Sequence, residues 1–193
     1  MKPEIAELVG YILDDEEFEE ALMLGWSYRF KEDPLPIEKF FELDSKIGIP
    51  LPSHTKYPIE YRSIIRSIKY YCEYEIMTGI RVPRHFVSNA CAHLESCAKL
   101  LLEKIESARY ANAPLGPVLY RLSQLSVSRD LIVKTFGVNK LVYVRAKHDW
   151  NIPDGEHLFE ADDAVMIYFA ARKLAKQLLD ERKIKIPMEE FER

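Results

Sequence analysis

The chain contains few glycines and has a small net charge, and each feature disfavours certain classes of protein. Only seven of its 193 residues are glycine. Side chains that favour helices are plentiful, which disfavours a β-sandwich or a barrel. Lysine and arginine number 27 against 31 aspartates and glutamates, so the net charge is only −4. Such a charge creates no global field toward nucleic acid or an anionic membrane, so RNA binding would need a local basic patch.

Cysteine is scarce as well. Cys72, Cys91 and Cys97 make an odd number, and no Cys-x-x-Cys pair occurs. On one helix Cys91 and Cys97 would lie on opposite sides, where they cannot form a disulfide. We therefore expect reduced, buried thiols and a cytoplasmic location.

Long apolar runs are missing too. The longest falls far short of the roughly 20 residues that a membrane helix needs, so no membrane span is expected. Residues 1–20 turn acidic after one short apolar run, unlike a secretory signal peptide. The apolar fraction of 48% is nevertheless enough for a sizeable core.

Apolar residues recur at helical spacing along most of the chain, which predicts an all-α protein. We expect a multi-helix up-and-down bundle over residues 53–193, preceded by an N-terminal helical extension over residues 1–52. The proline-rich stretch KIGIPLPSHTKYP marks the boundary. The clearest core helix begins at Pro83 and carries a stripe of apolar and small residues as far as Ile105.

Residues 138–145 contain several β-branched side chains, so they could form a strand. We interpret them as helical because Leu141, Val144 and His148 fit one helix face. The preceding helix is expected to end at Gly137. The last long helix is expected to begin near Glu160 and to bury one face.

Basic, acidic and imidazole side chains are concentrated between Lys140 and Glu160. Arg145 and His148 are three residues apart, so a helix would place them side by side. An arginine can bind a phosphate through two hydrogen bonds, and a histidine can exchange a proton with a ribose hydroxyl or a leaving oxygen. Lys147 adds positive charge. Alternatively, these basic residues end a helix and satisfy its last carbonyl groups.

Two further groups of polar residues have more than one interpretation. Tyrosines between residues 57 and 74 alternate with Arg62, Arg66 and Lys69, which suits stacking on a nucleic acid strand or, alternatively, a half-buried helix face. A second set has metal-ligand side chains but no recognised zinc spacing: His148, Asp149, Asp154, His157 and Glu160. His85 and His93 are interpreted as ordinary boundary histidines. We expect no bound metal and no cofactor.

Three segments together resemble the HEPN superfamily of all-α bundles. They are the long helix FVSNACAHLESCAKLLLEKI, the shorter LGPVLYRLSQL, and VYVRAKHDWN followed by the terminal helix DDAVMIYFAARKLAKQLL. The resemblance lies in the order of the helices and in the kinds of residue along them, and it spans roughly residues 58–183. It implies a cytoplasmic homodimer that acts on RNA or binds a nucleotide or a protein, in a defence or toxin–antitoxin setting.

Many HEPN proteins are metal-independent ribonucleases whose motif is an arginine, a polar residue and then a histidine after four to six intervening residues. Here Arg145 and His148 fall at the matching place, with two intervening residues and with Ala146 at the usual polar position. That departure favours a non-catalytic member that binds a nucleotide, RNA or a protein. A ribonuclease that uses Arg145 and His148 and a metal-dependent enzyme that uses His148, Asp149 and His157 are the alternatives.

Overall fold

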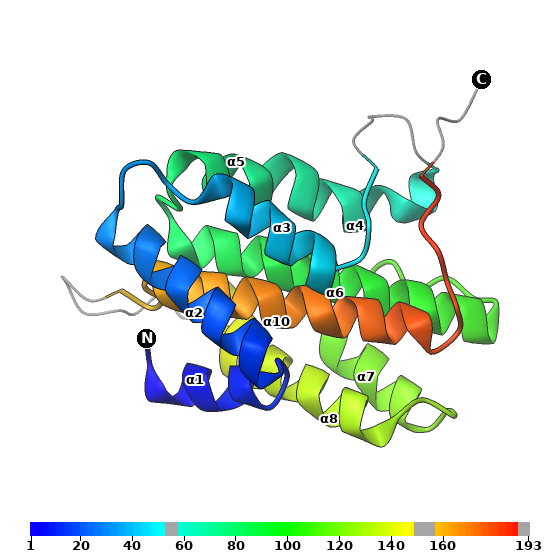
Figure 1. Ribbon diagram of the computed structural model, residues 1–193. Coiled ribbons are helices and arrows are strands. Elements are labelled where there is room, and N and C mark those ends of the chain that lie inside the picture. The colour runs from blue at the N-terminus through cyan, green and yellow to red at the C-terminus, as the bar shows by residue number, and fades with distance from the viewer. Residues whose placement is uncertain (53–57, 149–156, 189–193) are drawn as a thin grey trace.

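The computed structural model describes residues 1–52, 58–148 and 157–188. Across these residues the chain forms helices and no strands, so the all-α prediction is confirmed (Figure 1). None of the described helices is both long and apolar enough to cross a membrane. The elements are α1 (Pro3–Gly10), α2 (Asp15–Phe30), α3 (Ile37–Ile47), η1 (Ile59–Tyr61), α4 (Arg62–Arg66), η2 (Ser67–Cys72), α5 (Glu73–Thr78), α6 (Pro83–Glu106), α7 (Leu115–Ser123), α8 (Arg129–Val138), η3 (Asn139–Tyr143), α9 (Val144–His148) and α10 (Ala161–Asp180).

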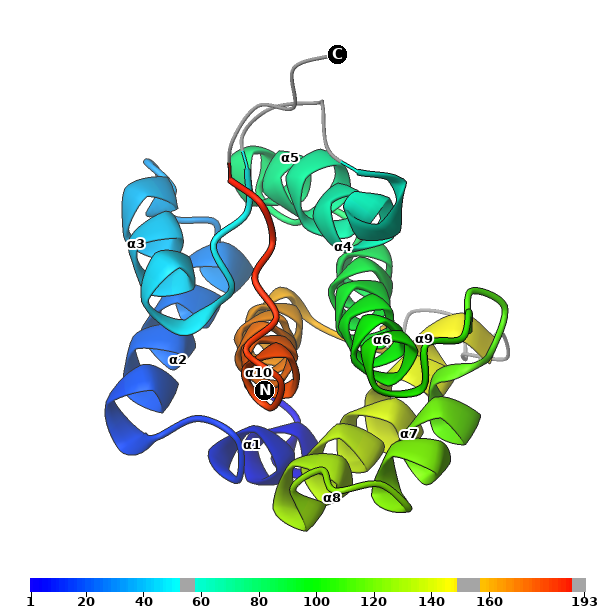
Figure 2. The ribbon, with the colours of Figure 1, turned by 90° about the vertical axis from the view of Figure 1, so that its right-hand side faces the viewer.

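Helix α10 lies at the centre of the bundle. Figure 2 looks along it and shows the other helices arranged around it. Every residue from Ala164 to Ala171 is buried. A helix that is apolar all round has to be enclosed by its neighbours. The prediction that this helix buries a single face is wrong, because the N-terminal helices cover its other side.

The most extensive helix–helix contact joins α10 to α6. Small residues on both helices allow the backbones to approach closely. The three cysteines are buried and free, as expected. Burial raises the pKa of the Cys91 and Cys97 thiols to about 12 in each case, so neither is a reactive thiolate at neutral pH.

The helices of the predicted N-terminal extension pack directly on α10, with α2 making the largest contact of the three. The ring of Phe40 on α3 lies 5.2 Å from that of Tyr168 and 4.7 Å from that of Phe169, measured between centroids. These rings therefore share one aromatic cluster. Residues 53–57, which lie at the predicted domain boundary, are outside the described residues.

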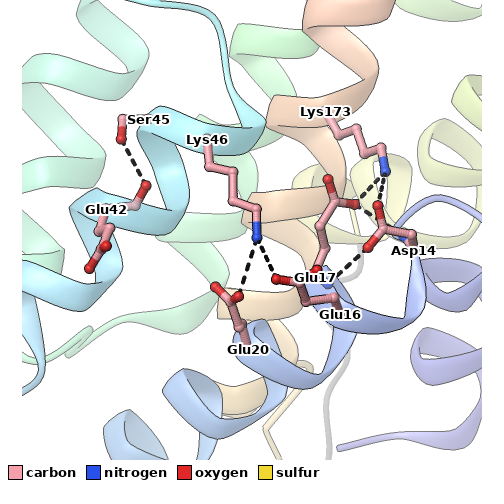
Figure 3. Close-up of polar contacts among 8 residues, drawn as sticks. All are labelled: Asp14, Glu16, Glu17, Glu20, Glu42, Ser45, Lys46 and Lys173. Atoms are coloured by element: carbon pink, nitrogen blue, oxygen red, sulfur yellow. Dashed lines mark hydrogen bonds and ion pairs between the residues drawn. The ribbon is translucent and has the colours of Figure 1, made fainter.

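Polar contacts at the surface link the same helices (Figure 3). The Lys46 ammonium on α3 lies 3.0 Å from a carboxylate oxygen of Glu16 on α2. Lys173 on α10 pairs with Glu17. Asp14 caps α2 by accepting a hydrogen bond from the Glu17 amide at 3.0 Å. The acidic start of α2 is thus used for capping and for ion pairs.

Two long helical segments contain a π-helical turn. One runs from η1 to α5 and contains η2, and the other runs from α8 to α9 and contains η3. The helical interpretation of residues 138–145 is confirmed. The expected end at Gly137 is wrong, because the helix continues to His148. Gly137 instead allows α1 to approach, since a Cβ there would lie 2.9 Å from Leu8 Cδ1.

Candidate functional site

The predicted catalytic pair lies on α9, near its C-terminal end. The side chain of Arg145 is 38% exposed, and one guanidinium nitrogen lies 3.9 Å from a carboxylate oxygen of Glu4 on α1. His148 is also exposed. Both groups can therefore reach a ligand in solvent, and the arginine already has a carboxylate beside it.

Lys147, predicted to bind nucleic acid, is held against the protein. Its ammonium lies 3.8 Å from the centroid of the Tyr143 ring and 3.3 Å from a carboxylate oxygen of Glu95 on α6. Burial alone would raise the pKa of Glu95, but hydrogen bonds from Lys99 and Tyr143 and the nearby ammonium charges outweigh burial, so that pKa is lowered. Glu95 is therefore a carboxylate at neutral pH and attracts Lys147 to the α6 surface.

The end of α9 is fixed by a residue from another helix. The guanidinium Nε of Arg84 on α6 donates a hydrogen bond to the Ala146 carbonyl at 2.7 Å. The contact therefore ties α9 to α6 and holds the segment that carries Arg145 and His148.

Arg66 and Lys69 lie on a different helical segment from α9. Arg66 stands 6.0 Å from the Tyr70 ring centroid, and Lys69 pairs with Glu73 at 2.7 Å. The segment from α4 to η2 packs on α6, as α9 does, so α6 lies between the two groups. Several tyrosines of this segment are exposed, namely Tyr70, Tyr71 and Tyr74, whereas Tyr61 is buried.

The predicted metal-ligand set is only partly described. Asp149 and Asp154 lie outside the described residues. Glu160 stands at the N-terminal end of α10, where its amide donates a hydrogen bond to the Asp163 side chain at 3.0 Å. Within residues 1–52, 58–148 and 157–188, no three His, Cys, Asp or Glu side chains are grouped as a metal ion would require.

Sequence reasoning missed a buried polar cluster around Arg172 of α10. Arg172 is 2% exposed and binds Asp44 of α3 through two hydrogen bonds, of 2.6 and 3.0 Å. The Nη2 atom that donates to Asp44 also donates to the Ile49 carbonyl at 2.7 Å. The apolar residues on both sides of it in α10 were the signal that it is buried.

His93 on α6 completes this cluster and is not the boundary histidine that was expected, because it is fully buried. Its Nδ1 lies 3.0 Å from the Ile64 carbonyl, and its Nε2 lies 3.1 Å from an Arg172 nitrogen. A carbonyl can only accept and a guanidinium can only donate, so Nδ1 carries the hydrogen and the ring is neutral. Burial and the Arg172 charge lower the pKa of His93 to about 3.

Comparison of the chain with protein-family models, with curated proteins and with solved structures found no match.

Proposed function

We propose that the chain is a HEPN-like, up-and-down helical domain that binds RNA through the exposed surface of α9 without cleaving it. The observation that carries the proposal is the exposure of Lys147 and His148 and the partial exposure of Arg145 within α9. A phosphate backbone is recognised by such local cations, even where the protein as a whole is mildly acidic.

One feature favours binding over cleavage. The two-residue spacing between Arg145 and His148 departs from the ribonuclease pattern. Arg145 and Lys147 each have a protein carboxylate within 4 Å, Glu4 for the arginine and Glu95 for the lysine, with which a phosphate must compete.

The test is fluorescence anisotropy with a labelled single-stranded RNA, in EDTA and at low salt. We expect Arg145→Gln and Lys147→Gln each to weaken binding about three- to tenfold, or ~1 kcal/mol, because each removes one phosphate contact. The control is Lys39→Gln on α3, which changes the charge equally at a position far from α9 and should leave the affinity unchanged. Equal weakening by all three variants would place the RNA elsewhere.

The same samples, run on a denaturing gel, test the metal-independent ribonuclease. On our proposal the RNA stays intact with the wild-type protein. If wild type cuts RNA in EDTA and His148→Ala does not, Arg145 and His148 are catalytic and the non-catalytic interpretation is wrong.

A second candidate is self-association of the same region into a homodimer. The continuous segment from α8 to α9 exposes Val133, Phe136, Leu141 and Val144. Exposed apolar side chains repeated along one segment favour a protein contact. We expect Val144→Lys to convert a dimer to a monomer in light scattering, while Met23→Lys, at a residue 61% exposed on α2, has no effect. A wild-type protein that is monomeric at every concentration would exclude this candidate.

A further inference from the structure

A cavity of about 810 Å³ opens at one end of the bundle. Its walls come from the C-terminal end of α2, the turn between α5 and α6, and the residues that lead into α10, at the left of Figure 1. Ligand sites in proteins typically measure roughly 300–1,000 Å³. The cavity is therefore large enough for a small organic molecule.

Two arginines of the cavity wall are fixed in place by the protein. Arg29 donates to a carboxylate oxygen of Asp162 at 2.9 Å, and the Asp162 side chain is fully buried. Arg84 is held through its bond to the Ala146 carbonyl. A guanidinium carries several N–H donors, so Arg29 can keep its anchor to Asp162 and still donate to an anion. Groups positioned beforehand lose little freedom when a ligand binds.

Further positive charge comes from exposed residues of the wall. Lys31 and Arg81 are both exposed, at the end of α2 and just before α6. The carboxylates of Glu32, Asp33 and Glu160 also lie in the wall. The first turn of α6 has no side-chain cap and presents the positive end of its dipole nearby. Four cations of the wall, Arg29, Lys31, Arg81 and Arg84, outnumber these three carboxylates, so the wall keeps a small excess of positive charge in a chain whose net charge is −4.

The remaining wall is apolar. Phe159 and Ile80 are buried to within a few per cent, and Leu35 and Val82 lie beside them. Ile80 adopts a φ of 50°, which is strained for a β-branched residue and is held by the surrounding turn. The wall thus offers an apolar surface next to a group of cations.

We propose that this cavity binds a small organic anion, with its phosphate or carboxylate group facing the cations at Arg29, Lys31 and Arg81 and its apolar body against Phe159 and Leu35. The inference is independent of RNA binding by α9.

The test is isothermal titration of the full chain with 2-naphthyl phosphate, 2-naphthoate, neutral 2-naphthol and inorganic phosphate. We expect at least one of the two naphthyl anions to bind more tightly than 2-naphthol and inorganic phosphate, and the tighter of the two identifies the acid group. Arg81→Gln should weaken that binding about tenfold, because it removes a charged donor from the site. The matched control is Arg109→Gln, an exposed residue just beyond the other end of α6, which should leave the affinity unchanged.

Lys31→Gly separates binding from folding. Lys31 ends α2 in the left-handed conformation, with a φ of 55°, which glycine adopts without strain. The variant should therefore melt at a higher temperature than wild type and yet bind the anion more weakly. Absence of binding by both naphthyl anions, equal affinity for 2-naphthol, or unchanged affinity in both Arg81→Gln and Lys31→Gly would overturn the proposal.

Discussion

His93 makes the stability of the protein depend on pH in a predictable direction. Its pKa is lowered to about 3 in the folded chain, whereas an ordinary histidine has a value of 6.5. The unfolded chain therefore binds a proton that the folded chain does not bind between these two values. The stability that neutral His93 contributes is complete above about pH 6.5 and is lost as the pH falls toward 3, by ~1.4 kcal/mol per pH unit.

The prediction is checked by urea unfolding at several pH values between 4 and 7.5. Carboxylates also titrate there, so the informative quantity is the difference between wild type and His93→Gln. A glutamine can still donate to the Ile64 carbonyl and accept from Arg172, but it cannot take up a proton. We expect the variant to lose stability on acidification with a shallower slope, smaller by about one proton. Identical slopes would mean that His93 is charged in the folded protein.

Individual elements show what the sequence could and could not predict. The caps at Asp14 and Ser128, the start of α6 at Pro83 and the end of α5 at Gly79 follow local rules, and all four are found. Gly137 broke the local rule because it serves a contact between α8 and α1, which no local pattern records. Whether a helix ends at such a glycine depends on which other helix packs against it, and a local pattern does not show that.

The segment from η3 to α9 shows a limit of the same kind. Leu141, Val144 and His148 were expected to share one helix face, and all three are exposed, whereas Val142, Tyr143 and Ala146 are buried. The π-turn η3 contains one residue more than an α-turn, so it rotates the following residues relative to an uninterrupted α-helix. Periodicity alone does not show such a turn, nor which face packs against the neighbouring helices.

In the candidate site, the local sequence indicates which side chains are exposed, whereas contacts between distant segments fix the position of the helix. The exposure of Arg145 and His148 agrees with a helix end rich in polar residues. The anchoring of that helix by Arg84, which precedes it by more than 60 residues, depends on how α6 and α9 pack. The cavity is likewise lined by parts of α2, α6 and α10 that are distant in the sequence and that only the packing of the helices brings together.

At the scale of the whole molecule, the predicted boundary at residues 52 and 53 can be tested by deletion. Removing residues 1–52 takes Phe40 from the aromatic cluster and leaves Arg172 without Asp44. An unpaired buried charge alone costs about 3–5 kcal/mol, a large part of the ~5–15 kcal/mol that stabilises a typical domain. We expect residues 53–193 on their own to lack a cooperative thermal transition in circular dichroism. A sharp transition close to that of the full chain would instead make them an independent domain.

The enclosure of α10 also sets an order of events during synthesis. The helices that surround it are almost all made first, and each leaves the ribosome with an apolar side that has nothing to cover it. Since α10 supplies the common surface for these helices, they cannot settle into their final positions until residues 161–180 have emerged. The nascent chain therefore stays open to chaperones and proteases for most of its translation.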